Sequence, residues 1–219
     1  MAREQANTPA IVIAVDGPAA SGKGTIARAL ARHYNLPEMD TGLLYRAVAL
    51  TLWRWGGDPS SEFEALRACG ELGFDPDDPE LRSEPVSKIA SAISAYPSVR
   101  AALLERQQEF AGQPGGAVLD GRDIGTVIAP DADVKLFVTA SAEVRAQRRV
   151  RELLARGMTA HYPEVLADIR SRDDRDSHRE VAPLKQADDA ILLDTSELDI
   201  EEAKAEAIRL VDERIGAKA

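Results

Sequence analysis

The stretch Gly17 to Thr25, Gly-Pro-Ala-Ala-Ser-Gly-Lys-Gly-Thr, decides the fold of this 219-residue chain. It follows the apolar run at 10–15 and leads into a helix-forming stretch that begins at Lys23. A glycine-rich loop between a buried strand and a helix can turn its backbone amides toward a phosphate, where the helix dipole also favours an anion. The setting therefore predicts a phosphate-binding loop, with a plain glycine-rich turn as the alternative.

Individual positions of this loop have separate expected roles. Gly17 and Gly22 leave room for the backbone to approach a phosphate, and Lys23 adds positive charge toward the β- and γ-phosphates. A hydroxyl usually follows this lysine and sits near Mg²⁺, but here Gly24 takes that position and the hydroxyl comes at Thr25. The string thus departs from the strict pattern by one residue.

Composition and charge fit a soluble globular protein. Hydrophobic residues make up 44% and charged residues 29% of the chain, and the formal net charge is −10. Because an acidic protein repels polyanions, we expect no general binding to nucleic acid or to an anionic membrane. No stretch approaches the roughly 20 apolar residues of a membrane span, and Cys69 is the one cysteine. We therefore expect a cytoplasmic protein in which Cys69 is a small buried apolar residue.

Apolar runs alternate with helical patterns, which predicts an α/β fold with right-handed crossovers. The expected strands are short and lack strict polar alternation, as is typical of a parallel sheet covered on both faces; they lie at 10–15, 117–119, 134–138, 190–193 and, more weakly, 36–39. The expected helices lie at 23–34, 43–55, 85–95, 99–111, 142–156, 163–172 and 200–215. Between Gly56 and Arg82 the pattern breaks down into Gly, Pro and acidic residues, which predicts an inserted lobe or loop.

Two polar motifs follow expected strands, at the sheet edge where open α/β folds bind ligands. In Asp40-Thr41-Gly42, Thr41 is expected to cap a helix whose Arg46 reaches an anion; a solvated arginine is the alternative. The apolar run at 117–119 ends in Asp120-Gly121-Arg122-Asp123. There Asp120 is expected to hold Mg²⁺ or its water, Arg122 to bind phosphate and Asp123 to accept a hydrogen bond, unless these charges only form salt bridges at the strand exit.

Arginine is concentrated in one segment. Nine of the 21 arginines, and no lysine, lie between Arg145 and Arg179. A guanidinium can bridge two phosphate oxygens and stays charged at any relevant pH, so in an acidic protein the cluster predicts a phosphate clamp. The alternative is a solvated helix face neutralised by neighbouring aspartates. We select as candidates for nucleotide contact Arg148, Arg149, Arg172, Arg175 and Arg179.

Together these residues resemble a bacterial-type cytidylate kinase, a family of the nucleoside monophosphate kinases. The resemblance runs from Ile11 to the last helix, and beside the loop at 17–25 it rests on Asp40-Thr41-Gly42 with Tyr45-Arg46, Ser91 with Tyr96-Pro97-Ser98-Val99-Arg100, the string at 120–126, and the strings at 172–176 and 179–184. It implies a phosphate-loop (P-loop) parallel sheet flanked by helices, with an inserted lobe that binds the nucleoside monophosphate and a short lid.

The resemblance also implies a division of the chain. We expect a flexible N-terminus at 1–9 and a single kinase domain at 10–219, whose core (10–40, 112–147 and 180–219) carries the lobe at 41–111 and the lid region at 148–179. In longer family members the lobe contains a small antiparallel sheet. The segment between Gly56 and Arg82 looks shorter, so we expect no complete sheet there. Closure of 149–160 is expected to exclude water, with Gly157 as a flexible point.

Residue roles follow by resemblance. ATP is expected to bind Gly17, Pro18, Ala19, Ala20, Ser21, Gly22, Lys23, Gly24 and Thr25, and the expected catalytic groups are Lys23, Arg122, Arg148, Arg149, Arg172 and Arg175. In the family the positions of Ser91, Arg100 and Asp123 contact cytosine, those of Arg46 and Arg122 hold the acceptor phosphate, and those of Asp176 and Arg179 contact the sugar. Thr41, where the family often has serine, joins this CMP-binding set, and Thr25 and Asp120 are expected to hold Mg²⁺ through water.

The chemistry of cytosine agrees with these roles. Its amino group can donate to Asp123, while Arg100 and Ser91 donate to the ring nitrogen and carbonyl. We therefore expect a monomeric enzyme of pyrimidine nucleotide metabolism that converts ATP and CMP, or dCMP, to ADP and CDP or dCDP by direct in-line transfer without a general base, with Mg²⁺ as cofactor. The alternatives are a kinase for UMP, AMP or shikimate, and a GTP-dependent switch, which the lack of an Asn-Lys-x-Asp or Thr-Lys-x-Asp string disfavours.

Overall fold

The computed structural model describes residues 11–71, 73 and 75–217. The predicted flexible N-terminus at 1–9 and the first residue of the expected strand at 10–15 lie outside the described residues. The elements are, in chain order, β1 (Ile11–Asp16), α1 (Lys23–Tyr34), β2 (Glu38–Asp40), α2 (Thr41–Trp55), α3 (Glu62–Cys69), the 3₁₀ turn η1 (Pro79–Arg82), α4 (Glu84–Ile93), α5 (Pro97–Ala111), β3 (Gly116–Gly121), the π turn η2 (Ile124–Ile128), β4 (Val134–Thr139), α6 (Ala142–Ala155), α7 (Tyr162–His178), β5 (Ile191–Asp194) and α8 (Ile200–Gly216).

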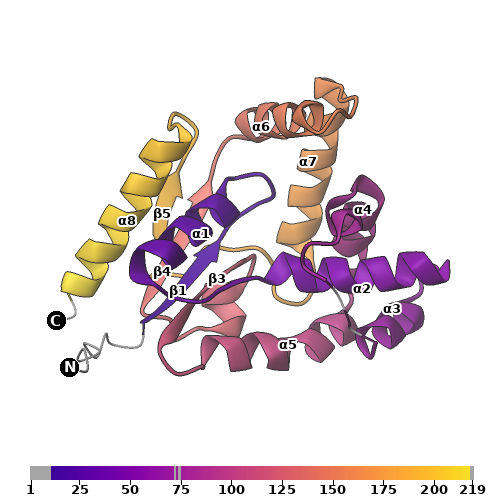
Figure 1. Cartoon of the computed structure of the whole chain (residues 1–219), viewed down its shortest axis with the longest axis horizontal. Helices are drawn as coiled ribbons and strands as arrows, with labels where there is room; N and C mark the ends of the chain where they lie inside the picture. The colour runs from indigo at the N-terminus through magenta and orange to yellow at the C-terminus, as the bar shows by residue number, and fades with distance from the viewer. Residues whose placement is uncertain (1–10, 72, 74, 218–219) are drawn as a thin grey trace, which may run out of the picture.

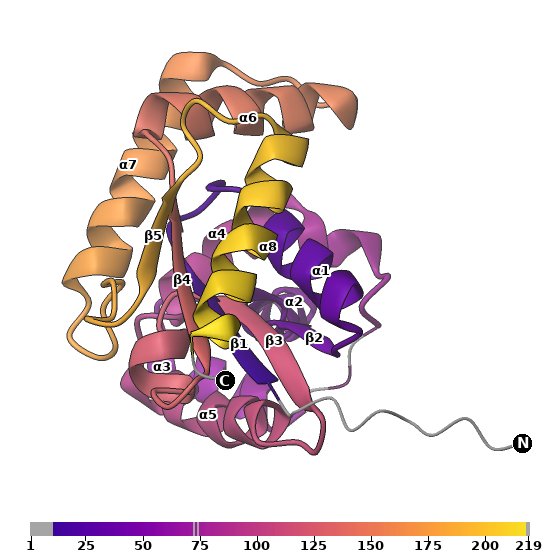
Figure 2. The same cartoon turned by 90° about the vertical axis from the view of Figure 1, so that its left-hand side faces the viewer.

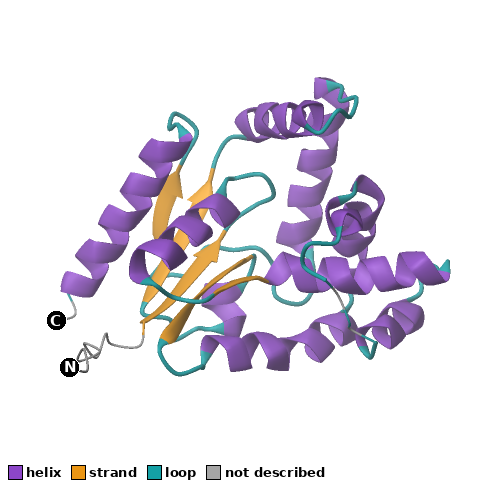
Figure 3. Ribbon diagram, viewed as in Figure 1, coloured by secondary structure: helices purple, strands orange, loops and turns teal. Residues whose placement is uncertain are grey.

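The described strands form one parallel sheet in the order β2-β3-β1-β4-β5 (Figures 1 and 3). The central strand β1 pairs with β3 on one side and with β4 on the other. Because all five strands run in the same direction, their carboxyl ends meet at one edge of the sheet. The predicted α/β fold, a parallel sheet flanked by helices, is confirmed.

The side chains of β1 alternate between two apolar layers, as they must in a sheet covered on both faces. Ile11, Ile13 and Val15 pack in the cluster that includes residues of α1 and α8, whereas Ala14 packs in the cluster that includes residues of α5 and η2. Figure 2 shows α1 and α8 lying together against the strands. Both faces of the sheet are thereby covered by apolar side chains, and its carboxyl edge is left for polar residues.

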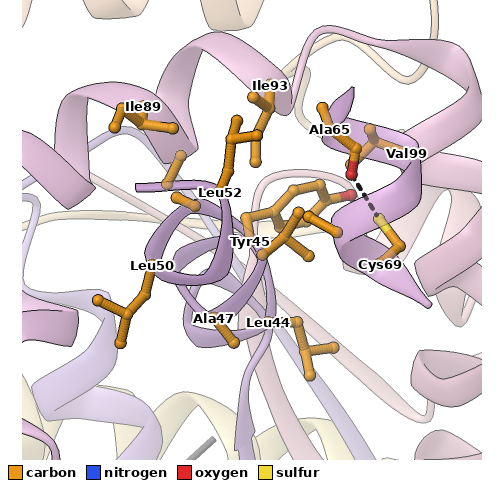
Figure 4. Close-up of a cluster of buried hydrophobic side chains, with 14 of the residues drawn as sticks. Leu44, Tyr45, Ala47, Leu50, Leu52, Ala65, Cys69, Ile89, Ile93 and Val99 are labelled. Atoms are coloured by element: carbon orange, nitrogen blue, oxygen red, sulfur yellow. Dashed lines mark hydrogen bonds between the residues drawn. The ribbon is translucent and has the colours of Figure 1, made fainter. Parts of the chain in front are cut away.

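Helices α2 to α5 enclose a separate apolar interior beside the sheet, with η1 closing it (Figures 1 and 4). Leu52, Ile93 and Leu103 are fully buried there. Cys69 is buried as predicted, and its thiol donates to the Ala65 carbonyl at 3.4 Å. These helices fall within the lobe expected at 41–111, whose boundaries stay a prediction.

Three local differences from the expected elements have physical causes. The segment 56–82 holds the two-turn helix α3, which Ser61 caps by accepting from the Glu64 amide, and none of its described residues is in a strand. Helix α7 continues past 172 because its polar last turns make ion pairs with Arg145 of α6 and with Arg122, the residue directly after β3. The expectation that Thr41 caps α2 is wrong: the Thr41 hydroxyl donates to the Asp120 carbonyl at 2.8 Å.

None of the described helices is both long enough and apolar enough to span a membrane.

Candidate active site

The predicted phosphate-binding loop connects β1 to α1 at the carboxyl edge of the sheet. Gly17 and Gly22 have φ values of 152° and 92°, in the region that favours glycine. A Cβ on Gly17 would lie 2.0 Å from the Val138 carbonyl oxygen, so this position also needs glycine for space. Helix α1 begins at Lys23, directly after the loop. The predicted sequence of strand, loop and helix is thus present.

Opposite charges are concentrated beside this loop. Burial, together with repulsion from Arg122, lowers the pKa of Lys23 to about 8. Burial and the nearby Asp40 carboxylate raise the pKa of Asp120 to about 7. Asp40 and Asp120 are register partners on β2 and β3, which brings their carboxylates to the same edge. A cation or a proton at this edge would relieve their mutual repulsion.

The first cavity at the sheet edge has a volume of about 360 Å³ and opens between the sheet and the lobe helices. Asp123 is buried on its wall, where its carboxylate accepts from both Arg100 and, at 3.4 Å, Arg179. The Arg100 guanidinium also lies 5.6 Å from the centre of the Tyr45 ring. Sequence reasoning assigned Asp123, Arg100 and Arg179 to one ligand, and the structure brings the three side chains together.

A second charged cluster lies on the same wall. Arg122 Nε donates to Asp176 at 2.8 Å, and Arg172 Nε lies 4.0 Å from the same carboxylate. Burial alone would raise the pKa of Asp176, but Arg122 and Arg172 hold it below the ordinary value. Burial and repulsion from Arg122 lower the pKa of Arg172 to about 10, and its Nε makes no hydrogen bond to any described residue. This excess of positive charge suits an anion.

Two predicted acceptor contacts are occupied by protein partners. Arg46 lines the first cavity and donates to the Leu81 carbonyl at 3.0 Å and to Ser87 Oγ at 3.2 Å. The Ser91 hydroxyl accepts from Arg175 Nη1 at 2.6 Å. Neither Ser91 nor Arg175 is among the lining residues, which on this side of the cavity include Ala90 and Ser94.

The second cavity, of about 960 Å³, lies between α6 and the connection from β5 to α8. Arg148 and Arg149 both line it. Arg148 donates to the Thr195 hydroxyl at 2.9 Å and to the Thr195 carbonyl at 2.6 Å. Arg149 makes ion pairs with Glu84 at 2.5 Å and with Glu152 at 2.9 Å. Two of the five selected arginines are thus on this side of the loop.

The two cavities meet at the phosphate-binding loop. Both are lined by Ala20, Gly22, Thr25 and Glu152. Lys23 and Asp120 line the first cavity only. A ligand with phosphates on the loop could therefore extend into the second cavity, while another ligand approaches the same phosphates from the first.

The residues near the loop offer few ligands for a metal ion. Among the residues that the structure describes, no group of three or more His, Cys, Asp or Glu side chains is arranged to hold one. Asp120 Oδ1, however, is buried and has no hydrogen-bond partner within the described chain. A single free carboxylate oxygen fits Mg²⁺, which usually takes one or two protein carboxylates together with water and substrate phosphates.

Asp16 is a residue of this site that sequence reasoning missed. Its buried carboxylate accepts from the amides of Ile124 and Gly125 at 2.8 and 2.7 Å, directly after Asp123. Burial raises the pKa of Asp16 to about 6, although these two hydrogen bonds favour the charged form and so lower it. The available signal was an acidic residue at the last position of an apolar strand, next to a glycine-rich loop.

Comparison with known proteins gives one consistent family. The sequence model described as cytidylate kinase matches residues 13–213. The chain is 58% identical over 206 residues to a protein of Xanthobacter autotrophicus named cytidylate kinase, with 93% of this chain and 98% of that protein covered. It is 57% identical over 203 residues to a protein of the same name from Methylocella silvestris, with 92% and 94% covered.

Among solved structures, an uncharacterized protein from Eubacterium ventriosum is similar with a TM-score of 0.57. Its sequence is 16% identical, and the match covers 92% of this chain and 98% of that one. At this identity the likeness concerns the fold alone.

Proposed function

This chain belongs to the cytidylate kinase family of phosphotransferases, and we propose that it transfers the γ-phosphoryl group of ATP to the phosphate of CMP, with ADP and CDP as products. We extend the proposal to dCMP as a second acceptor and to a role in pyrimidine nucleotide metabolism. The enzyme is proposed to act as a monomer, with the lobe at 41–111 and the lid region at 148–179 as the parts that close over the substrates.

The observation that carries the proposal is the meeting of the two cavities at the phosphate-binding loop. ATP would lie along the loop with its base in the larger cavity beside Arg148. CMP would lie in the smaller one, whose wall carries Asp123, Arg100 and Arg179. A protein that only binds one nucleotide has no use for a second charged cavity aimed at the same phosphates.

Base recognition is assigned to the wall of the smaller cavity. Asp123 would accept from the cytosine amino group, and Arg100 would donate to the ring nitrogen, since both side chains are already fixed by their ion pair. Ser91 would have to exchange its hydrogen bond from Arg175 for one to the base. Uracil would place a carbonyl against the Asp123 carboxylate, and such a mismatch of buried polar groups costs about 1 to 3 kcal/mol.

The reaction needs no general base. The CMP phosphate has its second pKa near 6, by analogy with phosphorylated side chains, so its attacking oxygen is largely deprotonated near neutral pH. The protein has to align the two phosphates in line and to neutralise charge on the transferring oxygens. Lys23, Arg122 and Arg172 would do this, and their common place in the lining of the smaller cavity supports the assignment.

Mg²⁺ is the proposed cofactor. Asp120 would hold it through the carboxylate oxygen that has no hydrogen-bond partner among the described residues, with Thr25, the last residue of the loop, as the second group. When bound, the ion neutralises phosphate charge.

The lid region would exclude water during transfer. Helix α6 ends at Ala155, and Gly157 has a φ of 73° in the turn that follows. Arg149 bridges α6 to the lobe through its ion pair with Glu84, so closing motions of the two parts are linked at this contact. Equal rates of ATP hydrolysis with and without CMP would contradict closure around both substrates.

An acceptor screen tests the proposal most directly. Purified protein is given ATP with CMP, dCMP, UMP, AMP or shikimate, and ADP formation is followed for each acceptor. We expect the highest kcat/KM for CMP or dCMP. Preference for another acceptor would overturn the substrate assignment, and tight GTP binding without transfer would favour a nucleotide-dependent switch instead.

The variant Asp123→Asn tests base recognition within the same screen. We expect its CMP-to-UMP ratio of kcat/KM to fall by about tenfold to a hundredfold, as the energy of one mismatched buried polar pair implies. The matched control is the exposed Asp168→Asn, which removes the same charge from the surface of α7. An unchanged ratio for Asp123→Asn would show that this carboxylate does not read the base.

A further inference from the structure

Arg145, in the first turns of α6, is buried and makes contacts that no expected role explains. It is 5% exposed, and its Nε donates to the Ala140 carbonyl at 2.8 Å. Its Nη1 donates to the Ala19 carbonyl at 3.2 Å, and Ala19 is a residue of the phosphate-binding loop. The guanidinium therefore lies behind the loop and contacts the loop backbone from outside the nucleotide cavities, whose lining residues do not include Arg145.

This contact bears on the direction of a loop amide. The peptide unit is planar, so the N–H of Ala20 points opposite to the carbonyl of Ala19. A donor that holds this carbonyl on the outer side thereby directs the Ala20 amide to the inner side. Ala20 lines both cavities and has a φ of 59°, a conformation that side-chain-bearing residues rarely adopt without support. The Arg145 contact supplies such support.

The guanidinium is itself held in place from α7. Its Nη1 and Nη2 donate to the two carboxylate oxygens of Asp173 at 2.9 and 2.6 Å. Such a bidentate pair fixes the plane of the guanidinium as well as its position. The side chain of Arg145 is 6% exposed and that of Asp173 is 26% exposed, so the pair is only partly screened by water.

A second ion pair between the same two helices provides the contrast. Arg170 Nη2 donates to Glu143 at 2.7 Å, but both side chains are at least half exposed, and within the described chain neither makes a hydrogen bond to the loop. If the pair of Arg145 and Asp173 only joined α6 to α7, these two pairs would have the same kind of effect. Only the first of them reaches the backbone of the loop.

We propose that Arg145, held by Asp173, is a positioning residue that orients the Ala19–Ala20 peptide of the phosphate-binding loop for the phosphates of ATP. The inference rests on the proposed function, because it assigns ATP to this loop. Arg145 itself touches no substrate in this assignment. Its contribution is to keep a strained peptide in the orientation that binds an anion, so that ATP does not have to select a minor conformation of the loop.

The test compares Arg145→Lys and Asp173→Asn with the control Glu143→Gln. Lysine keeps the positive charge but cannot donate to the Ala19 carbonyl, the Ala140 carbonyl and both carboxylate oxygens at once. We expect both test variants to bind a non-hydrolysable ATP analogue about tenfold more weakly by calorimetry, about 1.4 kcal/mol at 25 °C. Their CMP affinity and that of the control for either ligand should stay within about twofold, by the same conversion.

Two further measurements separate positioning from simple stabilisation. In ¹⁵N-labelled protein, Arg145→Lys should shift the Ala20 amide resonance, whereas Glu143→Gln should leave it unchanged. Asp173→Glu, which keeps the carboxylate, should restore most of the ATP affinity. If Arg145→Lys fails to fold, Asp173→Asn and its rescue give the same comparison.

The outcomes are distinguishable from failure of the proposed function. Should the unsubstituted protein bind no ATP analogue, the proposed function itself is wrong. A lower melting temperature with unchanged ATP affinity, or an equal loss of ATP and CMP affinity, would reduce Arg145 to a structural link between helices and overturn the inference.

Discussion

Replacing Asp120 by Asn should change the pH dependence of stability by a predictable amount. The Asp120 carboxylate is 2% exposed, and its Oδ1 makes no hydrogen bond to any residue of the described chain. Burial and the nearby Asp40 raise its pKa from 3.8 to about 7. Asn has nearly the same shape and no charge, so the substitution removes the ionisation while it preserves the packing.

The direction and size of this change in the free energy of unfolding follow from the linkage between ionisation and folding. Because the pKa is higher in the folded protein, the neutral carboxyl favours folding fully below about pH 4, and this advantage is lost as the pH rises through about 7. One pKa unit corresponds to about 1.4 kcal/mol, so ionising Asp120 lowers the free energy of unfolding by about 4 kcal/mol in total. About 3 kcal/mol of this decrease falls between pH 5 and pH 8.

The assay is urea unfolding at pH 5, 6.5 and 8 without nucleotide or Mg²⁺. The free energy of unfolding of Asp120→Asn, relative to the unsubstituted protein, should rise by about 3 kcal/mol from pH 5 to pH 8. The ionisation of Asp16 is common to both proteins and cancels in this difference. Asp131→Asn, which removes an exposed carboxylate, is the matched control. A difference for Asp120→Asn that does not change with pH would refute the reasoning.

Three further changes test the fold around the site. Gly17→Ala should lower the free energy of unfolding in urea by at least about 2 kcal/mol, because its Cβ would lie 2.0 Å from the Val138 oxygen. Gly157→Ala, whose Cβ would have no described atom within 4 Å, should lower it by about 1 kcal/mol for its positive φ alone. Equal decreases for the two variants would contradict this. Ile93→Ala should cost about 2 to 5 kcal/mol because Ile93 is fully buried in the lobe interior, against less than about 1 kcal/mol for the half-exposed Leu154→Ala, as thermal unfolding would measure. Burial raises the pKa of the Cys69 thiol to about 11, so labelling by a disulfide reagent at pH 8 should be slow in the native protein and fast in denaturant; rapid native labelling would show that the lobe interior opens readily.

The Asp120 carboxylate is expected to favour function while it lowers stability. A buried carboxylate whose Oδ1 accepts no hydrogen bond from the described residues is unfavourable for folding, and Asn in its place should stabilise the protein at pH 8. We expect the same variant to transfer phosphate poorly, because it removes the proposed carboxylate for Mg²⁺. A gain of stability combined with a loss of activity would identify the ion site without any bound ion.

The strong local signals in the sequence predicted the sheet and its loop. The glycine-rich stretch at 17–25 after an apolar run indicated the strand, loop and helix, and the charges at 120–123 marked the end of a neighbouring strand. Helix α3 was missed, because two turns with three buried residues are too short for a helical period to show. Boundaries shifted most at α7, whose polar last turns are held by partners distant in the sequence.

The site was predicted as a set of residue types rather than as a set of contacts. Arginine spacing indicated a cluster, but a long flexible side chain can reach phosphate, carboxylate or a backbone carbonyl equally well. Arg148 donates both to the connection after β5 and, at 3.3 Å, to the Ser21 carbonyl of the loop, and Arg145, which we did not select, donates to the Ala19 carbonyl. Which acceptor each guanidinium reaches depends on how α6 and α7 pack, and this packing is not readable from spacing.

The apolar interior enclosed by helices α2 to α5 has a consequence for how the protein unfolds. The helices α2, α3 and α4 and the first turns of α5 bury their apolar side chains mainly against one another, whereas the end of α5 packs against the sheet through Ala111. We therefore expect this interior to unfold locally more easily than the strands. Mild denaturant can then melt this interior while the sheet persists, and amide hydrogen exchange would record two classes of protection instead of one. Under the proposed function, this would let residues on the acceptor side change with less effect on the loop that binds ATP.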